Sequence, residues 1–252
     1  MVAQILPSNT SVPTIDRDTF IADIYVARPG EHHTFLGPTG SGKTTLASEL
    51  IDVYATRDFP ALILVIKPKD DVVERTFVKG MKFKRLKSWP PLPPLWGKQT
   101  PRGYVLWPEH VYDPDKDDPK LHKEMRKGLL AAYANKIGHS KVVGNMVFAD
   151  ETWGLIDLKL SREIVTLHTR GRSMGCGLWV SSQRPTYIPK TSYSQAEHLF
   201  LAYEPDKSAR DRFREIGGVV NSEIIEAIVL RLKRYQWLYI RREDRYCCIV
   251  NA

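Results

Sequence analysis

A glycine-rich run near the start of the chain constrains the possible folds more than any other feature of the sequence. Residues 35–45 read FLGPTGSGKTT and match the pattern G-x-x-x-x-G-K-[ST] from Gly37 to Thr44. The residues before it, 31–36, predict a short strand, and apolar residues at helical spacing within 45–51 predict a helix. Because a strand, a glycine loop and a helix in this order can wrap a triphosphate, the sequence predicts a nucleotide site.

Each residue type in this loop has a physical role toward a bound nucleotide. Glycines let the backbone come close to the β-phosphate, so that successive N–H groups point at it. Lys43 would reach the β- and γ-phosphates, and Thr44 would offer its hydroxyl to Mg²⁺. We therefore expect ATP with Mg²⁺ to bind here, contacting Gly37, Pro38, Thr39, Gly40, Ser41, Gly42, Lys43, Thr44 and Thr45. The alternative is a glycine-rich turn that binds nothing.

A second predicted part of the site is an apolar strand that ends in two carboxylates. Residues 146–151 read MVFADE, and side chains at the carboxyl ends of parallel strands face the ligand crevice. We expect Asp150 to bind Mg²⁺ together with Thr44, and Glu151 to act as general base on the attacking water. Without the glycine loop, the same pattern would indicate a solvated acidic turn.

Two further motifs carry polar residues that could complete the site. The predicted strand at 177–182 is followed by Gln183, whose amide could sense the γ-phosphate or the attacking water. Arg170 and Arg172 lie in the turn before that strand. Either could stabilise a transferring phosphoryl group in a neighbouring subunit, or both could simply complement a helix dipole. The sequence does not distinguish the two arginines.

The positive charge of the chain is concentrated in one segment. The net charge is +8, and no acidic residue lies between Glu74 and Glu109. Within this interval we select as candidates for contact with DNA phosphates Lys79, Lys82, Lys84, Arg85 and Lys87. A solvated surface is the alternative. Prolines are dense in residues 89–94, so we expect residues 69–103 to form an inserted loop without regular helix or central strand.

Predicted strands and helices alternate along the chain, which indicates the α/β class with a mostly parallel central sheet and helices on both faces. Apolar runs at 228–230, 236–240 and 246–250 predict terminal strands and C-terminal β-hairpins. We interpret residues 1–252 as one domain with an N-terminal extension at 1–22. His32, His33, Trp179, Phe200 and Trp237 are predicted to be packing residues.

Composition excludes several classes of protein. No run approaches 18 uncharged apolar residues, so no membrane span is expected, and the polar start of the chain lacks the pattern of a signal peptide. The three cysteines offer no C-x-x-C pair, which argues against a disulfide framework or a zinc site. We therefore expect a cytoplasmic protein, which for a viral chain means the cytoplasm of the host. Association with the virion is a further possibility.

Together these motifs resemble the HerA/FtsK superfamily of DNA-pumping ATPases. The resemblance covers about residues 30–220 and rests on residues 37–44, 148–151, 170–185, 204–207 and 214–218. The most discriminating part is a Gly-Arg-Ser-x-Gly turn followed by a strand that ends in Gln-Arg-Pro. The resemblance implies a RecA-like P-loop NTPase core that assembles as a ring, usually a hexamer. It also implies a site completed by an arginine of the neighbouring subunit, with DNA threading through the centre.

A motor of this size, with no large N-terminal barrel and no membrane anchor in its sequence, resembles viral genome-packaging ATPases. We therefore expect an ATP-driven translocase of double-stranded DNA that docks on a capsid vertex or other docking protein. One alternative is a conjugation or plasmid-mobilisation ATPase with the same core. A kinase for nucleotides or small molecules is a second, although it would not need the water-activating Glu151. A third is a non-motor, nucleotide-gated assembly ATPase.

Overall fold

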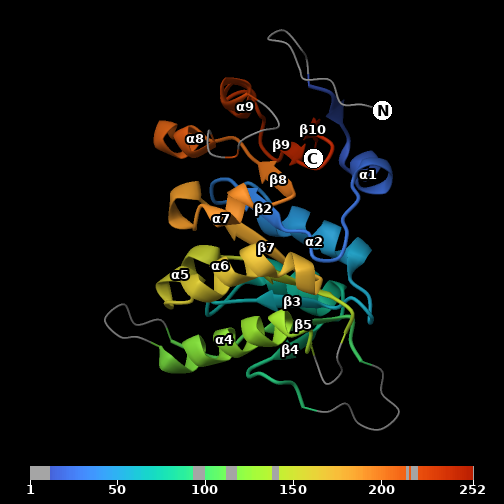
Figure 1. Cartoon of the computed structure of the whole chain (residues 1–252), viewed down its shortest axis with the longest axis vertical. Helices are drawn as coiled ribbons and strands as arrows, with labels where there is room; N and C mark the ends of the chain where they lie inside the picture. The colour runs from blue at the N-terminus through green and yellow to red at the C-terminus, as the bar shows by residue number, and fades with distance from the viewer. Residues whose placement is uncertain are drawn as a thin grey trace.

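The computed structural model describes residues 12–92, 100–111, 118–137, 142–213, 216 and 221–251. In this part of the chain one ten-stranded sheet has the order β1-β10-β9-β8-β2-β7-β6-β3-β5-β4 (Figure 1). From β8 to β4 all neighbours are parallel, whereas β9 is antiparallel to β8 and to β10. The strands are β1 (Thr14–Ile15), β2 (His33–Leu36), β3 (Ala61–Leu64), β4 (Lys84–Leu86), β5 (Gly103–Leu106), β6 (Asn145–Ala149), β7 (Cys176–Ser182), β8 (His198–Leu201), β9 (Trp237–Arg241) and β10 (Tyr246–Val250).

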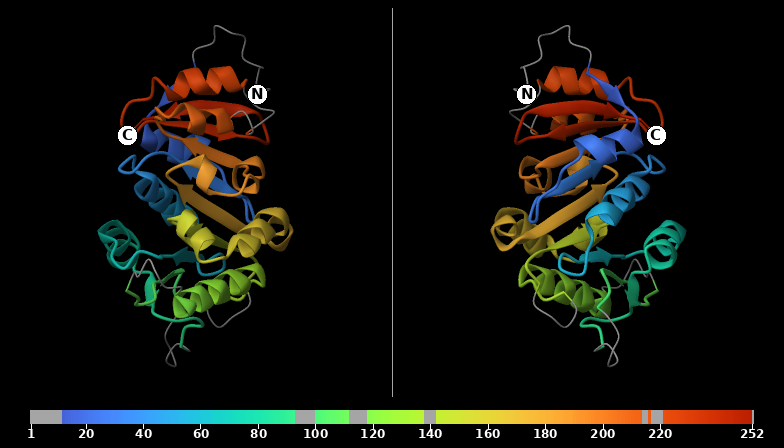
Figure 2. Two further views of the ribbon diagram at one scale, coloured as in Figure 1. Left: turned by 90° about the vertical axis from the view of Figure 1, so that its left-hand side faces the viewer. Right: turned by 90° about the vertical axis from the view of Figure 1, so that its right-hand side faces the viewer.

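Helices cover both faces of the sheet (Figure 2). The α-helices are α1 (Arg17–Thr19), α2 (Lys43–Tyr54), α3 (Asp71–Val73), α4 (Pro119–Tyr133), α5 (Thr152–Asp157), α6 (Ser161–Arg170), α7 (Thr191–Ser194), α8 (Lys207–Phe213) and α9 (Ser222–Val229). Short helical segments of other types include η1 (Phe20–Ile24), η2 (Glu74–Gly80), η3 (Arg172–Met174) and η4 (Pro185–Tyr187).

Alternation along the strands divides the core into two layers. Leu62 and Leu64 of β3 pack on the face that α4, α6, α7 and α9 cover, whereas Ile63 packs with Leu46 of α2 on the other face. Successive strand residues point to opposite faces, and both faces are buried, so the central strands are apolar throughout. The predicted α/β class, with a mostly parallel sheet between two layers of helices and a C-terminal hairpin, is confirmed.

Two predicted local structures are wrong. The apolar run at 228–230 is not a strand, because α9 extends through Val229. Ile225 and Val229, one helical turn apart, are both buried, and the side chain of Asn221 caps the helix by accepting from the N–H of Glu223. A short apolar run alone does not separate a strand from the buried face of a helix.

The segment 69–103 also differs from the expected loop. Before its prolines, the chain forms α3 and η2, and then β4 pairs in parallel with β5 as an edge strand. Trp89 is buried and packs edge to face on Tyr104. Trp96 and Lys98 lie outside the described residues. Whether this segment is an insertion stays a prediction.

The N-terminal segment is more closely integrated than an irregular extension. Its strand β1 pairs with β10, and Phe20 is fully buried against Phe200 and Tyr239. The histidines and aromatic residues predicted to pack in the core are buried, as are the three cysteines, which are free thiols. In the part of the chain that the structure describes, no helix is long and apolar enough to cross a bilayer.

Candidate nucleotide site

The glycine-rich loop connects β2 to α2 at the carboxyl edge of the sheet. Gly40 and Gly42 have φ angles of 77° and 92°, a backbone conformation that glycine adopts without steric cost. At Gly37, a Cβ atom would lie 2.5 Å from the Cβ of Ala202, which directly follows the neighbouring strand β8. Since no side chain caps the first turn of α2, the loop leaves backbone N–H groups available to an anion.

Lys43 lies over this loop. Its ammonium donates to the carbonyl oxygens of Gly37 and Pro38, at 2.7 and 2.9 Å. Burial lowers the pKa of Lys43 to about 8, even though the carboxylates of Glu151 and Asp150 act in the opposite direction. The ammonium is therefore poorly solvated, and a phosphate placed on the loop would offer it a stronger acceptor than two neutral carbonyls.

Asp150 follows the last residue of β6 and is 4% exposed. Its Oδ1 accepts a hydrogen bond from the hydroxyl of Thr44 at 2.5 Å, which joins the two predicted metal ligands. Burial raises the pKa of Asp150, and Lys67 and Thr44 partly offset this effect. A carboxylate and a hydroxyl oxygen that meet in this way fit Mg²⁺, which prefers oxygen ligands.

The described residues contain no group of three His, Cys, Asp or Glu side chains that could hold a metal ion unaided.

Glu151 and Gln183 meet at the same edge, although 32 residues separate them along the chain. The amide Nε2 of Gln183 donates to Oε2 of Glu151 at 3.3 Å, because β6 and β7 are parallel neighbours whose carboxyl ends lie side by side. A cavity of 340 Å³ joins these residues to the loop and is lined by Thr39, Gly40, Gly42, Lys43, Thr44, Thr45, Lys67, Asp70, Val72, Asp150, Glu151, Gln183 and Tyr235.

Two groups of residues in this region were not predicted from the sequence. Lys67, just beyond β3, forms ion pairs with Asp70 and Asp150. Lys67 is a polar residue that follows a buried strand, and this pattern in the sequence could have identified it. A second cavity of 440 Å³ lies on the other side of the glycine loop, where Tyr203 and Tyr235 are among its lining residues. Tyr235 comes from the connection between α9 and β9, and no sequence pattern points to it.

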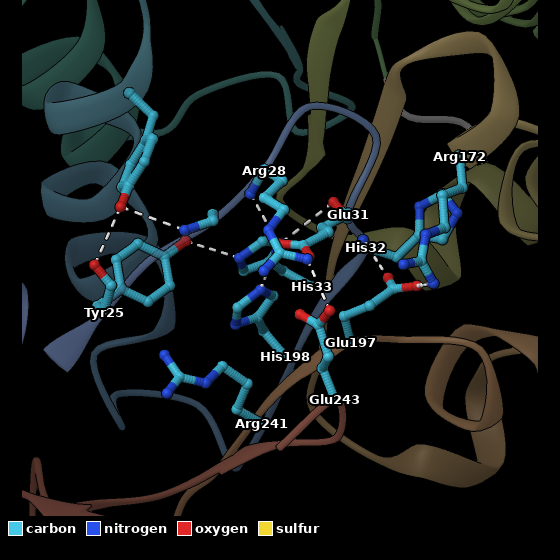
Figure 3. Close-up of polar contacts among 12 residues, drawn as sticks. Tyr25, Arg28, Glu31, His32, His33, Arg172, Glu197, His198, Arg241 and Glu243 are labelled. Carbon is cyan, nitrogen blue, oxygen red and sulfur yellow. Dashed lines mark hydrogen bonds and ion pairs between the residues drawn. The ribbon is translucent and has the colours of Figure 1, made fainter. Parts of the chain in front are cut away.

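Arg170 and Arg172 do not join this site. They lie at the opposite, amino edge of the sheet, separated from Gln183 by the whole of β7. A seven-residue strand spans about 23 Å, so neither side chain reaches the cavity of its own subunit. Arg172 donates to Oε1 of Glu197 at 2.7 Å (Figure 3), whereas Arg170 forms no ion pair with any described residue.

The candidate DNA contacts lie on η2, on β4, on the connection between them and, for Lys87, directly after β4, and all five are exposed. Arg85 pairs with Glu74 at 3.2 Å and lies over the ring of Trp107, and Lys87 pairs with Glu109 at 2.5 Å. Lys79, Lys82 and Lys84 form no ion pair among the residues that the structure describes, so their charges are available to a polyanion.

Comparison with known proteins gives no match to any family model and none to a curated protein. Similar solved structures include the genome packaging NTPase B204 from Sulfolobus turreted icosahedral virus 2 in complex with sulfate, at TM-score 0.61 and 18% identity over 89% of this chain and 98% of that chain. The complex of the same NTPase with AMPPCP is also similar, at TM-score 0.58 and 18% identity over 88% of this chain and 98% of that chain.

VirB4 of Thermoanaerobacter pseudethanolicus has a TM-score of 0.63 at 10% identity, over 99% of this chain and 97% of that chain. At identities of 10% and 18%, these similarities show the fold. The chain shares its fold with the genome packaging NTPase B204 and with VirB4, in agreement with the P-loop core that its motifs predict.

Proposed function

We propose that the chain is an ATP hydrolase that translocates double-stranded DNA and serves as a viral genome-packaging motor. One observation carries the proposal: a single cavity brings together the glycine loop, Asp150, Glu151 and Gln183. A kinase needs the loop and a metal ligand, but it does not need a carboxylate held by an amide at the position of the attacking water.

The residues of the cavity have distinct roles in this proposal. Lys43 leaves the two carbonyls and binds the β- and γ-phosphates. Thr44 and Asp150 hold Mg²⁺, which when bound neutralises negative charge on the phosphate oxygens. Glu151 accepts a proton from the attacking water, and Gln183 orients that carboxylate through its amide. The nucleoside end of ATP then lies in the neighbouring cavity, beside Tyr235.

The positions of the two arginines support the proposal of a ring. The cavity lies at the carboxyl edge of the sheet, and Arg170 and Arg172 lie at the amino edge. In a head-to-tail assembly, one edge of each subunit faces the opposite edge of the next, which would bring one of these arginines to the neighbour's phosphates. Such an assembly forms a ring where the rotation between subunits closes. We propose a hexamer of this kind.

DNA contact is assigned to the exposed lysines of η2, β4 and their connection. Lys79, Lys82 and Lys84 provide positive charge that no described carboxylate neutralises. Contacts with phosphates carry no sequence information, so we propose binding that is non-specific and strongly dependent on salt. We place the working enzyme in the host cytoplasm, docked on a capsid vertex protein.

The similarity to VirB4 favours one alternative with the same chemistry, a conjugation ATPase. Co-purification separates the two functions: a capsid vertex protein as the bound partner supports packaging, and a relaxase supports conjugation.

The proposed function is tested by steady-state ATP hydrolysis with and without double-stranded DNA, using Glu151→Gln as the blank. Hydrolysis that DNA stimulates and that the substitution abolishes supports a DNA-driven ATPase. Hydrolysis that is equal with and without DNA favours a non-motor assembly ATPase instead.

The arginine role is tested separately by mixing Arg170→Ala or Arg172→Ala subunits with Glu151→Gln subunits. An arginine that acts in the neighbouring site gives partial recovery of turnover in the mixture. If neither arginine substitution lowers turnover, the proposed contribution in trans is wrong.

A further inference from the structure

One ammonium group contacts three carboxylates at the proposed catalytic centre. The Nζ of Lys67 lies 3.2 Å from Oδ2 of Asp70, 3.4 Å from Oδ2 of Asp150 and 3.9 Å from Oε2 of Glu151. The two longer contacts are with the residues assigned to metal binding and to water activation. Lys67 is therefore part of the cavity, although the glycine-loop chemistry gives it no role.

The backbone of Lys67 is fixed, whereas its side chain opens to the cavity. Its carbonyl accepts a hydrogen bond from the indole N–H of Trp107 at 2.7 Å, just beyond the buried strand β3. Its side chain is 43% exposed. The ammonium can therefore move among its acceptors by rotation of side-chain bonds alone, without displacement of the strand.

Asp70 is an acceptor whose position does not depend on the nucleotide. Its Oδ1 caps the first turn of α3 by accepting from the N–H groups of Val72 and Val73, which leaves Oδ2 for Lys67. The two oxygens of Asp150 are divided in a similar way, with Oδ1 on Thr44 and Oδ2 on Lys67. A divalent cation and the ammonium would thus compete for Asp150, and their like charges repel.

We propose that Lys67 is a positioning residue that takes the place of the divalent cation before nucleotide binds. Its ammonium holds the carboxylates of Asp150 and Glu151, then shifts onto Asp70 when the metal–nucleotide complex enters. This inference rests on the proposed binding of Mg²⁺ with ATP at Thr44 and Asp150. In this proposal Lys67 raises the Mg²⁺ concentration needed for nucleotide binding, and Asp70 lowers it.

Two substitutions of nearly unchanged shape test the proposal. Lys67→Gln removes the competing charge, so the Mg²⁺ concentration needed for half-maximal nucleotide binding should fall, on the order of tenfold. Asp70→Asn removes the acceptor to which the ammonium retreats, so the same concentration should rise severalfold. Asparagine caps helices as well as aspartate does, so α3 should be preserved. Lys67→Arg keeps the charge and should stay near the wild type.

Lys69→Gln is the matched control. Lys69 lies two residues further along, pairs with Asp71 at 3.4 Å, and both side chains are 82% exposed. Removal of this charge should leave the Mg²⁺ dependence unchanged, since Lys69 forms no ion pair with Asp150 or Glu151.

The measurement is the fluorescence of a non-hydrolysable ATP analogue titrated with Mg²⁺, so no turnover is required. Opposite shifts for Lys67→Gln and Asp70→Asn, with Lys69→Gln unchanged, support the proposal. Suppose that the wild type needs Mg²⁺ and that both variants fold but keep the same Mg²⁺ dependence. That result overturns the role of Lys67 and leaves the proposed metal site standing. A wild type that binds the analogue equally with and without Mg²⁺ overturns the metal site itself, and the role of Lys67 with it.

Discussion

Acidification from pH 7 to 5 should destabilise the fold through buried histidines near the amino edge of the sheet. His32, His33 and His168 are at most 3% exposed, and burial lowers the pKa of each of them. The pKa of His32 falls to about 4, with the positive charge of Arg172 as a further cause. Other rings surround them: the rings of His32 and His168 lie edge to face, and His33 stacks between Trp179 and His198. Figure 3 shows His33 beside His198.

The sign follows from proton uptake. In the unfolded chain these histidines take up protons as the pH falls through about 6.5, whereas in the folded chain they stay neutral down to a much lower pH. Their contribution to stability is present above pH 6.5 and is lost as the pH falls toward the folded pKa. For His32 the loss between pH 7 and 5 is about 2 kcal/mol.

Burial also lowers the pKa of His33 and of His168, so these two residues add to the loss in the same direction. Nearby carboxylates modify this loss. Burial raises the pKa of Glu197, which acts in the opposite direction. Burial also acts to raise the pKa of Glu31, but hydrogen bonds from His198 and from the N–H of Arg28 keep that pKa below its usual value, so in the folded chain Glu31 titrates below this range.

His168→Leu isolates one of these protons. Both ring nitrogens of His168 lack a hydrogen-bond partner among the described residues, so leucine removes a proton acceptor without breaking a hydrogen bond. We expect the loss between pH 7 and 5 to shrink, by at most about 2 kcal/mol, which is the limit for a histidine that stays neutral in the folded chain. Urea denaturation at pH 7, 6 and 5, followed by tryptophan fluorescence, measures this difference. The control is His122→Leu on α4, which replaces a histidine that is only partly buried. Equal losses in wild type and His168→Leu would refute the reasoning.

Three further predictions concern the proposed site. The pKa of Lys43 is about 8 before phosphate binds, so the affinity for ATP should fall above pH 8, by up to about tenfold per pH unit. Lys43→Arg, which stays charged, should show no such fall, and equilibrium binding measures the difference. Glu151→Gln should lower turnover by about 100-fold or more while retaining nucleotide binding, as single-turnover and binding assays would show. Replacing Lys82 and Lys84 with glutamine should reduce the slope of log affinity for DNA against log salt by about 2, and an unchanged slope would exclude both contacts.

The sequence was most informative where chemistry is local. The glycine loop and the strand before Asp150 could be identified because each role depends on neighbours along the chain and on the rule that carboxyl ends of parallel strands form the crevice. The same rule placed Gln183 beside Glu151, and the structure brings the two within hydrogen-bond distance.

Features that depend on strand order could not be predicted in this way. Lys67 reaches Asp150 because β3 lies next to β6, far from its position in chain order. The pair of Arg172 with Glu197 likewise depends on elements that tertiary packing brings together. In α9, burial of Ile225 and Val229 decided the structure where the apolar run alone was ambiguous.

The central claim is that the ATP site drives movement along DNA. The most direct test measures the displacement of a fluorescent third strand from a DNA triplex in the presence of ATP. The wild-type protein and the Glu151→Gln variant are compared in parallel. We predict ATP-dependent displacement by wild type and none by the variant. Wild-type protein that binds duplex DNA and hydrolyses ATP, yet releases the third strand no faster than Glu151→Gln, would contradict the account.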